Sequence, residues 1–189
     1  MVFSLFKKGG FILKNGFVKK NINGRIYNFP KTEVDAVINC RKAGIHANCT
    51  WIMAYPGEEL KHLQTSVAFI MWQKDFCTKG IEPGTENFKK LEGGVNQKMF
   101  TATAYPGTEL WKGVRPDLKM HFDLNFDQYG EPICDDAFHT YVLELDDATK
   151  VLNNKNGDPV NLGSMKMDTF LQAREYVDSN QIEKILEME

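Results

Sequence analysis

Apolar residues in the first third of the chain change from a helical to an extended spacing. Val34, Val37 and Ile38 recur at helical intervals, and they predict a helix over 32–43 with Thr32 as its N-cap and Gly44 just past its end. The run 45–54 is short and rich in β-forming residues, and it is bounded by Gly44 and by Pro56-Gly57. This pattern predicts a buried strand directly after the first helix.

A second helix and a second strand follow in the same order. Apolar residues from Leu60 to Met71 mark one face of a helix that we expect from residue 58 to about residue 76. Glycine and proline residues in 77–97 predict a long loop. The run 97–104 predicts a second strand, and a short helix is expected to follow it.

The two ends of the chain carry weaker signals. Asn15-Gly16 and Asn23-Gly24 favour short hairpins or loose connectors before residue 30. Residues 121–127 alternate strictly and predict an edge strand, whereas 138–146 fits either an extended or a helical segment. Ser164 is expected to cap a last long helix. A final amphipathic turn is expected at Ile182, Ile185 and Leu186.

Composition narrows the class of protein. The chain has 189 residues, enough for a domain with a full hydrophobic core. A formal net charge of −2 argues against a nucleic-acid partner, and the lack of a run of ~20 apolar residues argues against a membrane span. The start has no secretory signal pattern, so we expect a cytoplasmic protein. The cysteines lack the spacing of zinc or redox motifs and are expected to be buried thiols: Cys40, Cys49, Cys77 and Cys134.

A seven-residue segment occurs twice, each time between a predicted strand and a predicted helix. The segments 54–60 (AYPGEEL) and 104–110 (AYPGTEL) agree at six of seven positions. Proline and glycine favour a sharp turn, and the acidic residues are expected to stabilise the N-terminus of the following helix. Consecutive strand–turn–helix units predict parallel strands, whose carboxyl ends are the usual place of function. Taken singly, each segment is also explained as an effective turn.

These segments carry a resemblance to a known family. The run KAGI at 42–45, leading into TWIMAYPGE at 50–58, resembles the fifth strand and turn of radical S-adenosylmethionine (radical SAM) enzymes. TAYPGTELW at 103–111 is similar to the sixth-strand segment of the same enzymes, particularly of the cobalamin-associated branch. The resemblance covers about 31–113, with a weaker likeness over 141–177.

The resemblance implies an α/β fold, a partial (β/α) barrel with parallel strands and a helical C-terminal tail. It divides the chain into an irregular, hairpin-like N-terminal segment (1–30), a partial barrel (31–135) and a helical tail that packs on the barrel (136–189). In this family a Cys-x3-Cys-x2-Cys loop holds a [4Fe–4S] cluster, which converts S-adenosylmethionine to a 5′-deoxyadenosyl radical. That motif is absent here, and a complete barrel needs roughly 200–250 residues.

The expected cofactors and partners follow from the family and from the absence of its cluster motif in this chain. S-adenosylmethionine and a [4Fe–4S] cluster are implied by the family, but we expect that this chain does not ligate the cluster. Cobalamin is implied only for a full-length relative. The expected partner is the missing N-terminal half of the barrel, in the same or another polypeptide, and the small-molecule substrate is not identified by the sequence.

The resemblance also nominates binding residues at the ends of the two strands. In the family, the fifth strand packs on the adenine and the sixth strand lines the same cavity. By position these residues are Trp51, Ile52, Met53, Ala54 and Tyr55 in the first segment, and Ala102, Ala104 and Tyr105 in the second. Each of them is alternatively a core residue without ligand contact. No catalytic or metal-ligating residue is assigned.

Two functional hypotheses remain. The first is a partial radical SAM-type enzyme, inactive alone, that contributes to the S-adenosylmethionine and substrate pocket. The second is a non-catalytic binding or scaffolding protein derived from that family, with the N-terminal segment as a cap over the sheet edge.

Two further clusters of polar residues lie in the second half of the chain. His121 and Asp123 share one face of the predicted edge strand, where a metal site is conceivable but a solvated face is the simpler explanation. Glu144, Asp146 and Asp147 could supply a carboxylate pair, although the sequence shows no pocket around them.

Overall fold

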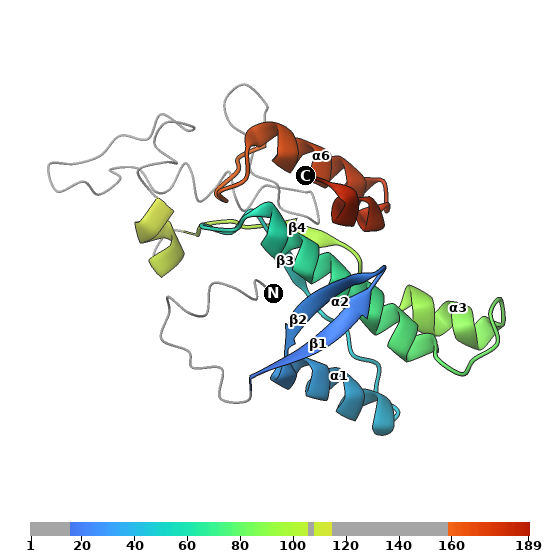
Figure 1. Ribbon diagram of the computed structural model, residues 1–189. Helices are drawn as coiled ribbons and strands as arrows, with labels where there is room; N and C mark the ends of the chain where they lie inside the picture. The colour runs from blue at the N-terminus through green and yellow to red at the C-terminus, as the bar shows by residue number, and fades with distance from the viewer. Residues whose placement is uncertain (1–15, 106–107, 115–158) are drawn as a thin grey trace, which may run out of the picture.

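The computed structural model describes residues 16–105, 108–114 and 159–189. The predicted edge strand, the undecided segment 138–146 and the acidic cluster at 144–147 lie outside these ranges. The described part is a mixed α/β structure with an antiparallel hairpin, a short parallel sheet and several helices (Figure 1). Its elements are β1 (Phe17–Ile22), β2 (Arg25–Pro30), α1 (Lys31–Lys42), β3 (Trp51–Met53), α2 (Leu60–Thr78), α3 (Glu86–Gly93), β4 (Met99–Thr101), α6 (Met167–Asp178) and the 3₁₀ helix η2 (Ile182–Glu187).

The N-terminal hairpin is confirmed at Asn23-Gly24. Both residues have positive φ angles, 51° and 83°, as a two-residue turn between twisted strands requires. The side chain of Asn21 accepts a hydrogen bond of 3.0 Å from the Gly24 N–H and closes the turn. All six residues of β1 pair with β2 in antiparallel register.

Helix α1 begins and ends within one residue of its predicted bounds. Its C-terminus is a Schellman motif, since the N–H groups of Gly44 and Ile45 donate to the carbonyls of Arg41 and Cys40. The predicted N-cap was wrong. Pro30 occupies that position without a side-chain bond, and Thr32 lies inside the first turn.

The two central strands are parallel and adjacent, as predicted. Trp51 pairs with Met99 and Met53 with Thr101. Both strands are shorter than the predicted runs 45–54 and 97–104, because the regular ladder covers three residues in each. Within the described ranges this sheet has two strands and forms no closed barrel.

Helix α2 lies at the centre of the described structure. Five consecutive residues, 66–70, are buried, so neighbours surround the helix on every side rather than on the single face that was predicted. The Phe69 ring contacts Phe29 of the hairpin at 5.0 Å and Trp51 of β3 at 5.5 Å. One hydrophobic core therefore joins the hairpin, α2 and the parallel sheet.

The prediction of a loop over 77–97 was wrong in part, because this segment contains helix α3. Its local signal was Thr85, whose hydroxyl accepts a hydrogen bond from the Phe88 N–H and caps the helix. The predicted cap of the last helix was also wrong, because α6 begins after Lys166 rather than at Ser164. The final turn is confirmed as η2, with all three predicted apolar residues buried.

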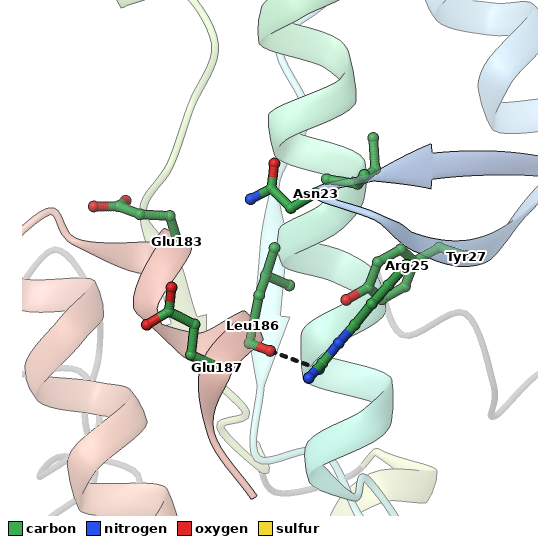
Figure 2. Close-up of a pocket in the computed structure, with 7 residues that line it drawn as sticks. Asn23, Arg25, Tyr27, Glu183, Leu186 and Glu187 are labelled. Carbon is green, nitrogen blue, oxygen red and sulfur yellow. Dashed lines mark hydrogen bonds between the residues drawn. The ribbon is translucent and has the colours of Figure 1, made fainter.

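The C-terminal segment returns to the N-terminal hairpin. Arg25 at the start of β2 donates a hydrogen bond of 2.9 Å to the Leu186 carbonyl of η2 (Figure 2). A cavity of about 230 Å³ lies beside this bond, lined in part by Asn23, Glu183 and Glu187. Because Arg25 and Leu186 lie far apart in the sequence, this contact ties the two ends of the described chain together. In the parts of the chain that are described, no helix has the length and apolar character needed to cross a bilayer.

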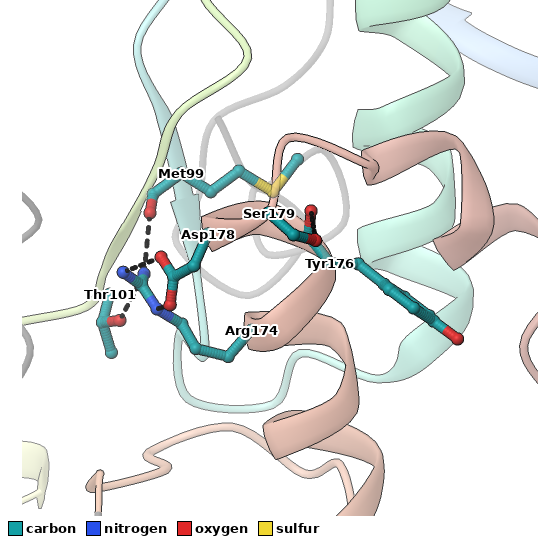
Figure 3. A network of polar contacts seen from close by, with 6 residues as sticks. All are labelled: Met99, Thr101, Arg174, Tyr176, Asp178 and Ser179. Atoms are coloured by element: carbon teal, nitrogen blue, oxygen red, sulfur yellow. Dashed lines mark hydrogen bonds and ion pairs between the residues drawn. The ribbon is translucent and has the colours of Figure 1, made fainter.

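A buried arginine covers the outer edge of β4. Ala102 donates from its N–H to the Met53 carbonyl at 2.9 Å, so alternate carbonyls of β4 face away from β3. Arg174 of α6 donates to one of these, the Met99 carbonyl, at 3.1 Å and forms a two-pronged ion pair with Asp178 (Figure 3). The guanidinium thus occupies a position where a further strand would pair.

Replacing Arg174 by lysine is expected to lower the free energy of unfolding by about 2 kcal/mol, since an ammonium group cannot bridge Met99 and Asp178 together. Equilibrium urea denaturation measures the change. The matched control is Lys61→Met, which removes an exposed pair with Glu59 and is expected to cost less than about 1 kcal/mol. Equal losses in both variants would contradict a structural role for the Arg174 bridge.

Candidate functional site

The carboxyl ends of β3 and β4 bring the two Ala-Tyr segments to the same edge of the sheet. Because the strands are parallel and in register, Ala54-Tyr55 and Ala104-Tyr105 leave the sheet in the same direction. Ligands of α/β sheets usually bind at such an edge. The repeated turns are therefore positioned where a binding site is expected.

The two faces of β3 have different surroundings. Trp51 and Met53 are 1% and 0% exposed and belong to the core beside α2. Ile52 points to the opposite face and is 36% exposed. The three strand residues therefore cannot all contact one ligand, because side chains alternate along a strand.

A cavity of about 220 Å³ lies on the Ile52 face. Four of the eight nominated residues line it together: Ile52, Tyr55, Ala102 and Tyr105. The lining is completed by four residues that were not predicted as site residues: Phe100, Thr101, Thr103 and Leu110. Phe100 pairs with Ile52 across the sheet, so the alternation along β4 could have identified it. The other nominated residues, Trp51, Met53, Ala54 and Ala104, are buried and are not part of this lining.

A buried carboxyl group that was not predicted from the sequence lies beneath the first turn. Glu58 is 0% exposed, and its Oε2 accepts a hydrogen bond of 2.6 Å from the Ala54 N–H. Its Oε1 is buried and has no hydrogen-bond partner among the residues that the structure describes. Burial raises the pKa of Glu58 to about 7, although hydrogen bonds from the Ala54 and Tyr55 backbone oppose the shift.

Glu58 holds the backbone of the turn in an unusual conformation. Ala54 has a φ of +58°, which is costly for a residue with a Cβ. The Glu58 carbonyl accepts a hydrogen bond of 2.8 Å from the Ser164 N–H. Gly163 packs so closely that a Cβ there would lie 3.2 Å from the Glu58 carbonyl oxygen and 3.3 Å from Ala54 Cα. The turn is thus fixed from both sides, which positions Tyr55 at the cavity.

The two repeated turns differ in chemistry at their single non-identical position. Where the first has Glu58, the second has Thr108, which is exposed and caps its own helix by accepting from the Trp111 N–H at 3.1 Å. In the first turn the N-cap role belongs to the next residue, Glu59, through a reciprocal bond with His62. The expectation that both acidic residues serve the helix terminus was therefore wrong for Glu58.

Within the described residues, no three His, Cys, Asp or Glu side chains are placed to hold a metal ion. Cys40, Cys49 and Cys77 are free thiols. His121, Asp123 and Cys134 lie outside the described ranges, so the conceivable metal site on the predicted edge strand stays a prediction.

Comparisons of the chain with protein-family models, with curated proteins and with solved structures found no match.

Proposed function

We propose that this chain is the C-terminal part of a radical SAM-type barrel and that it supplies one wall of the pocket for S-adenosylmethionine and substrate. The observation that carries the proposal is the aromatic cavity at the carboxyl ends of two adjacent parallel strands, each followed by the repeated segment. The two-stranded sheet corresponds to the fifth and sixth strands of such a barrel. The partner is the missing N-terminal half, in cis or in trans.

The lining of the cavity suits a planar, weakly polar ring. Ile52, Phe100 and two tyrosines offer apolar and aromatic surface, which binds a purine by stacking and burial. A volume of about 220 Å³ is below the 300–1,000 Å³ typical of complete small-molecule sites. The cavity is therefore matched to the adenine ring, and the remainder of the ligand would lie against the partner half.

The [4Fe–4S] cluster does not fit the donor set of the described residues. A cluster needs several thiolates that converge on one iron–sulfur cube. Cys40 and Cys49 line a different cavity from the aromatic one. This chain is therefore not expected to ligate the cluster, and the cluster ligands are expected on the partner half.

Binding of S-adenosylhomocysteine, a stable analogue, tests the proposal. We expect weak, saturable binding to the purified chain, measured by NMR shifts at the Ile52 and Ala102 methyl groups. Ile52→Trp should abolish binding because the larger side chain fills the cavity from a partly exposed position. Phe17→Ala is the matched control, since Phe17 lies on the hairpin and is exposed. Absence of saturable binding, or full binding by Ile52→Trp, would overturn the proposal.

The same preparation tests the expected inactivity. After anaerobic reconstitution with iron and sulfide, we expect neither a bound cluster nor cleavage of S-adenosylmethionine. A brown species absorbing near ~400 nm that disappears when three of the cysteines are replaced would contradict this expectation, which rests on cluster ligation by converging thiolates.

A non-catalytic binding or scaffolding protein is the second candidate, and the hairpin favours it. Phe29 of β2 is completely buried against α2, so the hairpin completes the core of this chain itself. A cooperatively folded, iron-free monomer without affinity for S-adenosylhomocysteine would favour this candidate over the first.

A further inference from the structure

Two thiols border the same cavity at the end of β3 opposite the candidate site. Cys40 lies in the last turns of α1, and Cys49 lies two residues before β3. Both line one apolar cavity of about 110 Å³, together with Val37, Ala47, Trp51 and Phe69. The cavity leaves space for the sulfur atoms to move, which a close-packed core would not allow.

The thiols also interact electrostatically. Burial is the main cause that raises the pKa of Cys49, and the charges of Cys40 and Cys77 raise it further, whereas a hydrogen bond with Gln73 lowers it. Both Cys40 and Cys49 are partly exposed, so a small reagent can reach them. Cys77 is buried and does not line the cavity.

We propose that Cys40 and Cys49 form a reversible intramolecular disulfide when they meet a low-molecular-weight disulfide such as oxidised glutathione. The proposal is independent of the function proposed above, because the pair lies at the other end of the strand. The disulfide would link the C-terminal turns of α1 to the residues just before β3 in a redox-dependent way. The segment 45–50 between them contains no regular strand or helix.

The exchange proceeds in two balanced steps. The Cys40 thiolate attacks one sulfur of glutathione disulfide, and the S–S bond breaks to release a glutathione thiolate. The Cys49 thiolate then attacks the Cys40 sulfur of the mixed disulfide and expels the second glutathione thiolate. The protein loses two electrons and two thiol protons, and two molecules of reduced glutathione carry them away. The same exchange can begin at Cys49, with Cys40 then closing the disulfide.

The test uses the full chain under native conditions with oxidised glutathione, followed by thiol counting, intact mass and peptide mapping without reductant. We expect a loss of two of the four thiols and a single cross-linked peptide pair containing Cys40 and Cys49. Trp51 lines the same cavity, so tryptophan fluorescence should fall on oxidation and recover with dithiothreitol. Oxidation in urea serves as the control, where the cysteines should pair without preference.

Single cysteine-to-serine variants show which thiols form the disulfide. Cys77→Ser is expected to form the same disulfide, whereas Cys40→Ser and Cys49→Ser are expected to stop at a glutathione adduct or not react. Pairing that involves Cys77 or Cys134, adducts without closure in the unsubstituted chain, or unreactive thiols in the folded state would each overturn the proposal.

Discussion

Truncation of Trp51 to alanine is expected to lower the free energy of unfolding by about 3–5 kcal/mol, the range for large aromatic side chains removed from cores. Trp51 is almost completely buried, and its ring contacts Phe69 of the central helix at 5.5 Å. It also borders the small cavity beside Cys40 and Cys49, so its loss would enlarge an existing void. Urea denaturation followed by far-UV circular dichroism measures the change.

The matched control lies one residue away on the same strand. Ile52→Ala removes a partly exposed side chain from the opposite face of β3 and is expected to cost about 1 kcal/mol. The ratio of the two losses in the free energy of unfolding directly tests which side chains of β3 face the core. A loss below about 1 kcal/mol for Trp51→Ala would show that this side chain lies in an open cavity, and the assignment of the two faces would be wrong.

The second large effect concerns the pH dependence of stability at Glu58. The pKa of Glu58 rises from 4.5 in the unfolded chain to about 7 in the folded protein, so the folded state binds this proton more tightly. The stability due to protonated Glu58 is fully present below pH 4.5, and it is lost as the pH rises through 7. A pKa shift of this size corresponds to a change of about 3 kcal/mol in the free energy of unfolding.

Glu58→Gln should remove this pH dependence. Its amide oxygen can still accept the Ala54 N–H, and its side chain carries no charge at any pH. We expect the variant to be more stable than the unsubstituted chain at pH 8 and similar to it at pH 4.5, measured by urea denaturation across this range. The difference between the two proteins isolates Glu58 from other titrating groups.

Glu59→Gln is the control for this experiment. Glu59 lies next to Glu58 in the sequence, but it is exposed, and its pKa is lowered by a hydrogen bond to Lys61. This variant should retain the pH dependence of the unsubstituted chain between 4.5 and 7. Parallel loss of stability in the Glu58→Gln and unsubstituted proteins would show that Glu58 does not titrate in this window.

Local sequence determined the turns and the ends of several elements. Asn23-Gly24 specifies its hairpin because both positions require positive φ angles. Gly44 ends α1 for the same reason, through hydrogen bonds that span only a few residues. The repeated Ala-Tyr-Pro-Gly segments also predicted two parallel strands, because a strand, a sharp turn and a helix constrain the direction of the next strand.

Tertiary structure decided what local patterns could not specify. A short run rich in β-forming residues, such as 45–54, does not say which side chains face a helix. The ladder with β4 limited the strand to three residues and put Trp51 and Ile52 on opposite faces. Likewise, Glu58 resembles any acidic residue at a helix start. It became a buried carboxyl because Gly163 and Ser164, more than a hundred residues later, cover the turn. Burial and pKa depend on such distant contacts, so they are properties of the folded chain rather than of the segment.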